Sequence, residues 1–124
     1  MAANPQSTVK AIESTGAALG ASLIASTAYE ASHILKATPG TLISLVGYNS
    51  KTSAQFIQVH NLATLPAEAA VPSYVFTVPA SSNFSLDIPI SGAPFTAGIV
   101  VCNSSTGPTK TLGSNDCFFS AVVK

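Results

Sequence analysis

The chain has 124 residues, of which 47% are hydrophobic and 8% charged, and its five basic and five acidic residues give a formal net charge of zero. Soluble domains typically carry about 25% charged residues, so a chain this neutral is suited to packing against copies of itself or against other proteins. Its scattered lysines and its lack of arginine argue against phosphate recognition and nucleic-acid binding.

Residues 1–36 are rich in Ala, Ser, Thr and Gly and contain few large apolar side chains. The alanine content favours a helix, whereas Gly16, Gly20 and many hydroxyl side chains weaken one. We expect an N-terminal arm over residues 1–36, extended or partly ordered, although residues 31–36 could form an early strand. No run is long and apolar enough for a membrane helix, and the start lacks the basic region of a secretory signal. We therefore expect a protein that is made in a cytoplasm.

From residue 38 onward, short β-rich runs alternate with turns rich in Pro, Gly and Ser. The run at 41–49 is apolar at both odd and even positions, which is typical of a strand covered on both sides. Regularly spaced strands of this kind are typical of an antiparallel sandwich or barrel. We predict an all-β, jelly-roll-like antiparallel β-sandwich over residues 37–124. Its expected strands lie at 41–49, 54–61, 73–79, 84–90, 98–105 and 117–123.

The stretch SNFSLDIPI at 82–90 shows the clearest two-residue period in the chain. Alternate side chains of a strand point to opposite faces of its sheet. Ser85 and Asp87 are therefore expected to point outward, and Pro89 to lie at an edge or a bulge because it has no N–H. The residues expected to line the core are Phe84, Leu86, Ile88 and Ile90.

The last two predicted strands flank the loop at 106–116 and are expected to pair as a hairpin. Cys102 and Cys117 would then face each other across the two strands. We expect two small buried apolar side chains, with a disulfide as the alternative. Because the chain has no CxxC motif and no His/Cys cluster, a zinc site is not expected.

No catalytic, cofactor-binding or metal-binding residue is predicted, and we expect a protein that is not an enzyme. His33 and His60 are the available bases, no GxSxG motif is present, and each ring is expected to make a surface or interface hydrogen bond. The loop at 106–116 is the best candidate for exposed contacts, but one acid in its SNDC end is too few for calcium. The acids without an evident partner are Glu13, Glu30, Glu68, Asp87 and Asp116.

Two stretches, GTLISLVGYNSKTSAQFIQVHN at 40–61 and VPSYVFTVPASSNFSLDIPISGAPFTAGIVVCNSST at 71–106, carry a resemblance. Together they resemble small β-sandwich virion proteins of tailed bacteriophages and their metagenomic relatives. The matching features are a Gly-Xaa-Leu strand ending in Tyr-Asn, a His-Asn strand end, a Pro-led strand and a later Phe and Gly. In this chain they are Gly40, Leu42, Tyr48, Asn49, His60, Asn61, Pro72, Phe95 and Gly98.

The resemblance covers about residues 38–124, and the final loop departs from it by being short and having a single acid, Asp116. It implies a virion structural protein without catalytic residues, most of all a capsid decoration (cement) protein that stabilises the assembled head. A tail, neck or fibre component with a receptor- or glycan-binding role is the alternative. The implied partners are the major capsid protein or other virion proteins, in a homo-oligomer that is often a trimer. The implied location is the virion, assembled in the host cytoplasm.

Overall fold

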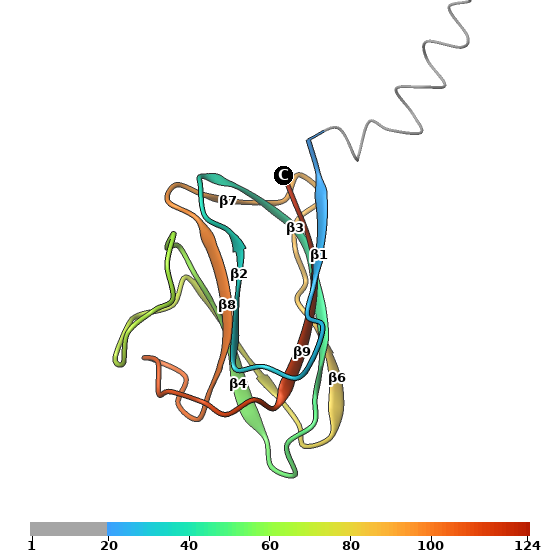
Figure 1. Cartoon of the computed structure of the whole chain (residues 1–124), viewed down its shortest axis with the longest axis vertical. Helices are drawn as coiled ribbons and strands as arrows, with labels where there is room; N and C mark the ends of the chain where they lie inside the picture. Colours follow the sequence, from blue (N-terminus) through green and yellow to red (C-terminus); the bar gives the residue numbers. More distant parts are fainter. Residues whose placement is uncertain (1–19) are drawn as a thin grey trace, which may run out of the picture.

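The structure, a computed structural model, describes residues 20–124, so residues 1–19 of the predicted arm lie outside the described residues. Residues 20–124 form two antiparallel sheets that pack face to face (Figure 1). Sheet A has the order β1 (Ser22–Ala25), β9 (Cys117–Val123), β3 (Gly40–Asn49) and β6 (Ser82–Ser85), with β7 (Ala93–Phe95) also paired to β3. Sheet B has the order β2 (Ser32–Lys36), β8 (Ile99–Ser104), β4 (Gln55–His60) and β5 (Tyr74–Val78). The predicted antiparallel β-sandwich is confirmed.

The strands pair in a nested way, first with last. β1 pairs with β9, β2 with β8, β3 with β6 and β7, and β4 with β5. Two four-stranded sheets connected in this way form a jelly roll, if β6 and β7 are taken as one interrupted strand along β3. The predicted hairpin between 98–105 and 117–123 is wrong, because β8 and β9 lie in different sheets and the segment between them crosses from one sheet to the other.

The segment at 20–36 is part of the sandwich. It supplies β1 to sheet A and β2 to sheet B, so the predicted domain boundary at residue 36 does not hold for these residues. Both strands lie at sheet edges, where few side chains need to face the core: Leu35 is buried there and Ile24 packs partly against it. That sparse apolar content gave the segment the composition of an arm. Residues 20–124 contain no helix that could cross a membrane.

The core lies between the two sheets and is built by alternation along each strand. In β9 the buried positions are 117, 119, 121 and 123, and the positions between them are partly exposed. Phe84 lies at the centre of an aromatic cluster, since its ring is 6.1 Å from that of Phe119 and 5.8 Å from that of Phe76. Complete burial of one such side chain contributes roughly 1.5 to 3 kcal/mol. The other fully buried core residues include Leu42, Leu45, Ile57, Val59, Ile99 and Val101.

The stretch at 82–90 follows its predicted period only in part. Phe84 is buried, and Leu86 and Ile88 pack against the core, but β6 ends at Ser85. Beyond that point the Leu86 N–H still donates to the Leu45 carbonyl at 2.9 Å, and the chain then turns away. Ile90, expected in the core, is fully exposed. The cause is a tight turn in which the Gly92 N–H donates to the Pro89 carbonyl at 2.8 Å.

A buried amide network joins the sheets at one end of the sandwich. The Gln55 side chain of β4 donates from Nε2 to Asn49 Oδ1 of β3 at 2.7 Å and to the Cys117 sulfur of β9 at 3.1 Å. Asn49 Nδ2 donates in turn to the Pro79 carbonyl at 2.9 Å. Buried polar groups are tolerated when they are paired, and this pairing fixes how the two sheets meet.

Candidate binding surface on sheet A

The outer faces of the two sheets differ in what covers them. On the outside of sheet B lie the two loops at 61–73 and 105–116 (Figure 1). They are joined to each other, because the Ala69 N–H donates to the Lys110 carbonyl and the Lys110 N–H donates to the Ala70 carbonyl, both at 2.8 Å. The 106–116 loop, which was the best candidate for exposed contacts, therefore covers part of the outer side of sheet B. Gly107 and Lys110 in it are buried.

One side chain of β4, Gln58, fastens this cover to sheet B. Its Nε2 donates to the carbonyls of Thr106, Gly107 and Thr109 at 3.0, 3.0 and 3.1 Å. The loop at 61–73 is held by Lys110, whose ammonium group donates to the Pro66 carbonyl at 2.9 Å. Gln58 is completely buried.

His60 lies in the same covered layer, with 1% of its surface exposed, so the predicted surface or interface role is wrong. Its Nε2 lies 3.0 Å from Gln58 Oε1. Because the Gln58 amide nitrogen already donates to three carbonyls, its oxygen must accept, and His60 Nε2 therefore carries the hydrogen. Nδ1 is left as an unpaired acceptor. Burial lowers the pKa of His60, and the charge of Lys110 lowers it further.

We expect the fold to lose stability as the pH falls below 6.5, the ordinary pKa of His60. The lowered pKa in the folded state means that, as the pH falls, His60 is protonated in the unfolded chain before it is protonated in the folded one. The stability that the neutral, buried ring contributes is therefore complete above pH 6.5. It declines below that value until the pH has passed the folded-state pKa. Urea unfolding between about pH 8 and about pH 5 measures the decline. His60→Gln should flatten it. An equally steep decline in His60→Gln would contradict the assignment.

The two cysteines are free thiols, so the predicted buried apolar role holds and the alternative disulfide is wrong. Cys117 faces the core between the sheets, whereas Cys102 on β8 points into the covered layer, where its sulfur lies 3.8 Å from Gln58 Oε1. Burial raises the pKa of Cys102 to about 11, against a smaller opposing effect of Lys110. Burial also raises the pKa of Cys117. Both thiols therefore stay protonated and unreactive at neutral pH.

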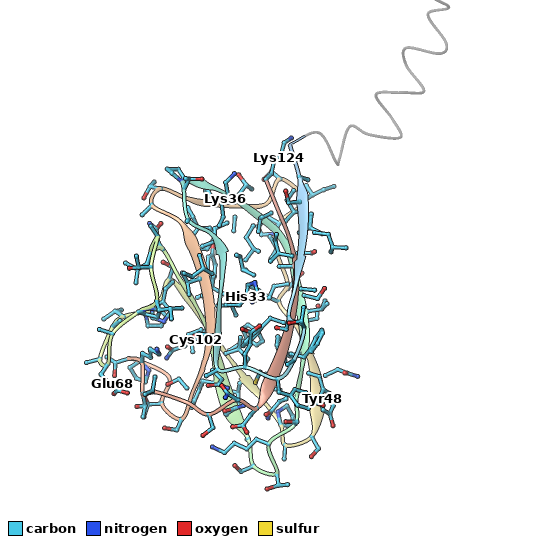
Figure 2. The ribbon with its side chains drawn as sticks, viewed as in Figure 1. His33, Lys36, Tyr48, Glu68, Cys102 and Lys124 are labelled. Atoms are coloured by element: carbon cyan, nitrogen blue, oxygen red, sulfur yellow. The ribbon has the colours of Figure 1, made fainter. Side chains whose placement is uncertain are left out.

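Within residues 20–124 the outer face of sheet A has no such cover. Its five strands contain no charged residue, and the register brings its outward residues together in apolar pairs, Leu23 beside Val122 and Tyr48 beside Phe118. Leu23 is 74% exposed and Val46 is 45% exposed. Tyr48 lies on this side of the molecule, opposite Cys102 and Glu68 on the side of sheet B (Figure 2). An exposed apolar face of this kind marks a contact surface.

One end of this face is hollowed into an open groove of about 960 Å³ that we call the aromatic groove. Tyr29, from the connection between β1 and β2, closes one side, and its ring lies 6.5 Å from that of Tyr48. Gly47 in its floor makes room for the Phe84 ring on the inner side of the sheet, since a Cβ atom there would lie 2.3 Å from that ring and 2.1 Å from the Phe118 carbonyl oxygen. The groove is lined by Ala28, Tyr29, Val46, Gly47, Tyr48, Asn83, Phe84, Phe118 and Ser120.

The titratable residues considered from the sequence do not gather at this groove. His33 Nδ1 lies 2.8 Å from Glu30 Oε2, and both side chains are about a quarter exposed. Glu68 accepts from the Leu112 N–H, Asp87 is exposed, and Glu13 lies outside the described residues. In residues 20–124 neither histidine is hydrogen-bonded to a hydroxyl or a thiol, and no group of three or more His, Cys, Asp or Glu side chains could hold a metal ion.

Comparison of the chain with known protein families, with curated proteins and with solved structures finds no match. The aromatic groove and the bare face of sheet A therefore have to be interpreted from their own chemistry. They offer apolar surface, aromatic edges and a few neutral hydrogen-bonding groups from Asn83, Ser120 and the tyrosine hydroxyls. Such a surface suits the binding of another uncharged surface.

Proposed function

We propose that this chain is a non-enzymatic structural protein of a bacteriophage virion that decorates the assembled capsid and stabilises it. Its partners are the major capsid protein or other virion proteins, and it acts as a homo-oligomer. The observation that carries the proposal is the outer face of sheet A, which is apolar and uncharged and which no part of residues 20–124 covers, on a chain of zero net charge. Covering a face of this composition with another subunit lowers the free energy, because apolar surface is removed from water.

The pattern of β3 supports this reading. Its apolar residues at both odd and even positions are typical of a strand covered on both sides. Within the described chain only the inner side is covered, by residues such as Leu42 and Leu45, while Val46 on the outer side stays exposed. The jelly roll also recurs in viral capsid domains, which is support by analogy of fold alone. The resemblance at 40–61 and 71–106 points the same way.

The test compares virus particles assembled with and without this chain. Particles that lack it should break at lower temperature or lower ionic strength, and added full-length protein should restore their resistance. Val46→Asp should bind such particles at least about tenfold more weakly, because the contact would bury an unpaired carboxylate. The matched control is Ser105→Asp, exposed on the side of sheet B. Equal resistance of both kinds of particle, with no outer density missing in electron micrographs, would refute decoration.

A tail, neck or fibre component that binds a host glycan is the second candidate, and the aromatic groove is the observation that favours it. Sugars stack on aromatic rings and hydrogen-bond to neutral polar groups, and Tyr29, Tyr48 and Asn83 line this groove. Binding on a glycan array that Tyr48→Ala abolishes would favour this role over decoration. The 106–116 loop is the weaker glycan site, because its carbonyl groups are partly engaged by Gln58.

A further inference from the structure

We propose that the outer face of sheet A pairs with the same face of a second copy of this chain, with Ile90 of each copy seated in the aromatic groove of the other. The inference rests on the proposed function in one respect, namely that this face is a contact between subunits. Because one face cannot hold a second copy and a capsid at once, the pair is the form of the free protein, and it separates when the face binds a capsid. It departs from the trimer that the resemblance implies, because the face carries the two halves of a two-fold contact.

Ile90 is the projecting half of this contact. Its side chain is fully exposed, at the tip of the turn that the Gly92 N–H closes on the Pro89 carbonyl. Beside it lie Thr41 and Ile43 of β3, at the opposite end of the strand from the aromatic groove. A branched apolar side chain held in water by a fixed turn loses little conformational freedom when it is buried.

The aromatic groove is the receiving half, and its position along β3 decides the symmetry. Gly92 lies against Thr41 and the Leu42 carbonyl, and the floor of the groove is at Gly47, about five residues or 17 Å farther along the strand. A two-fold axis that crosses the strands reverses their direction. It therefore places the Ile90 end of each copy over the groove end of the other. Such a contact is self-complementary and closes with two copies.

The charges permit this pairing. The strands of sheet A have no charged side chain, so two of these faces can meet without burying an unpaired charge. Asp87 and Lys124, both exposed, lie in the segments that follow β6 and β9, and Lys124 lines the hollow beside Ile90. The pairing therefore requires the long Lys124 side chain to keep its ammonium group in solvent at the end of the face. The outer side of sheet B offers no equivalent face, because the loops at 61–73 and 105–116 lie on it.

The area predicts a weak pair. A rise of about 3.3 Å per residue and a strand spacing of about 4.8 Å give each strand residue about 16 Å² of face. The five strands of sheet A have 4, 7, 10, 4 and 3 residues in the order β1, β9, β3, β6 and β7, so the face covers roughly 440 Å². Two copies would together bury roughly 900 Å² of strand surface, which is below the roughly 1,200 Å² of stable specific interfaces. We therefore expect a reversible dimer that forms at micromolar or higher concentrations.

Sedimentation of the full chain over a range of about 1 to 300 μM measures this equilibrium. Dimers should appear with rising concentration, and Ile90→Asp should weaken the association at least about tenfold. Leu112→Asp, at a leucine that is also exposed but lies on the side of sheet B, should leave it unchanged. Since Ile90 and Leu112 are both exposed, urea unfolding should show that the two variants fold as the parent does.

A crosslink tests the geometry itself. Chains carrying Ile90→Cys and chains carrying Val46→Cys should form a mixed disulfide when they are combined with oxidised glutathione as the oxidant, and neither variant alone should crosslink as fast. A chain that stays monomeric, a trimer, or a dimer that survives Ile90→Asp would overturn the inference. Particle binding separates the two proposals: a monomer that still binds capsids leaves decoration standing, and a dimer that binds no capsid leaves only the pairing.

Discussion

Replacing Phe119 by alanine should destabilise the protein by about 3 to 5 kcal/mol, the largest loss expected from a single side chain in the core. Phe119 on β9 is completely buried, and its ring packs at 6.1 Å from Phe84. The substitution removes the ring and leaves a cavity between two sheets, because the paired backbones of β9 and β3 cannot move together to fill it. Urea unfolding followed by tyrosine fluorescence or circular dichroism measures the loss.

The neighbouring residue supplies the matched control. Phe118 has the same side chain and the same strand, but it points outward into the aromatic groove. Phe118→Ala should therefore cost about 1 kcal/mol or less, the usual range for strand preference at a partly exposed site. Similar losses in the two variants would mean that the alternation along β9 does not separate a core face from an outer face.

This pair also shows which part of the fold a sequence makes predictable. Alternation is local, so the inward faces of β4 and β9 and the class of the fold could be predicted from it. Which strands share a sheet depends on contacts between distant residues, and no local pattern distinguishes a hairpin from a strand pair split between two sheets. The end of β6 is an intermediate case. The apolar period continues to Ile90, but the Pro89–Gly92 turn interrupts it, and the Pro and Gly were the available signal.

The sequence predicted only part of the candidate surface. The apolar residues on both faces of β3 predicted a strand that is covered on both sides, and within residues 20–124 only its inner side is covered. The aromatic groove itself needs Tyr29 beside Tyr48 and a glycine at 47, and these meet only after the connection between β1 and β2 has crossed the end of the sandwich. His60 shows the opposite error. The sequence predicted a surface or interface hydrogen bond for it, because the 106–116 loop, which helps to cover it, lies far along the chain from β4.

Substituting Gln58 by leucine should cost about 2 to 3 kcal/mol and detach the 106–116 loop from sheet B. Leucine fills a similar volume but donates no hydrogen bond, so the carbonyls of Thr106, Gly107 and Thr109 lose a common donor and His60 Nε2 loses its acceptor. A buried polar group left without a partner costs about 1 to 3 kcal/mol, and solvent entering beneath the loosened loop limits the sum. Thr77→Val, on the neighbouring strand β5, should cost less than about 0.5 kcal/mol.

Hydrogen exchange separates loss of the loop from general weakening. The Lys110 N–H, bonded at 2.8 Å to the Ala70 carbonyl, joins the two loops and should lose its protection in Gln58→Leu, while the amides of β3 and β9 keep theirs. Continued protection of Lys110 would mean that the loops hold each other without the Gln58 side chain. Loss of the cover would also expose Cys102 and His60 and make the outer side of sheet B a second apolar face. The Gln58→Leu protein would then expose an apolar face on each sheet. With two such faces it should form open-ended aggregates, whereas the parent protein forms pairs.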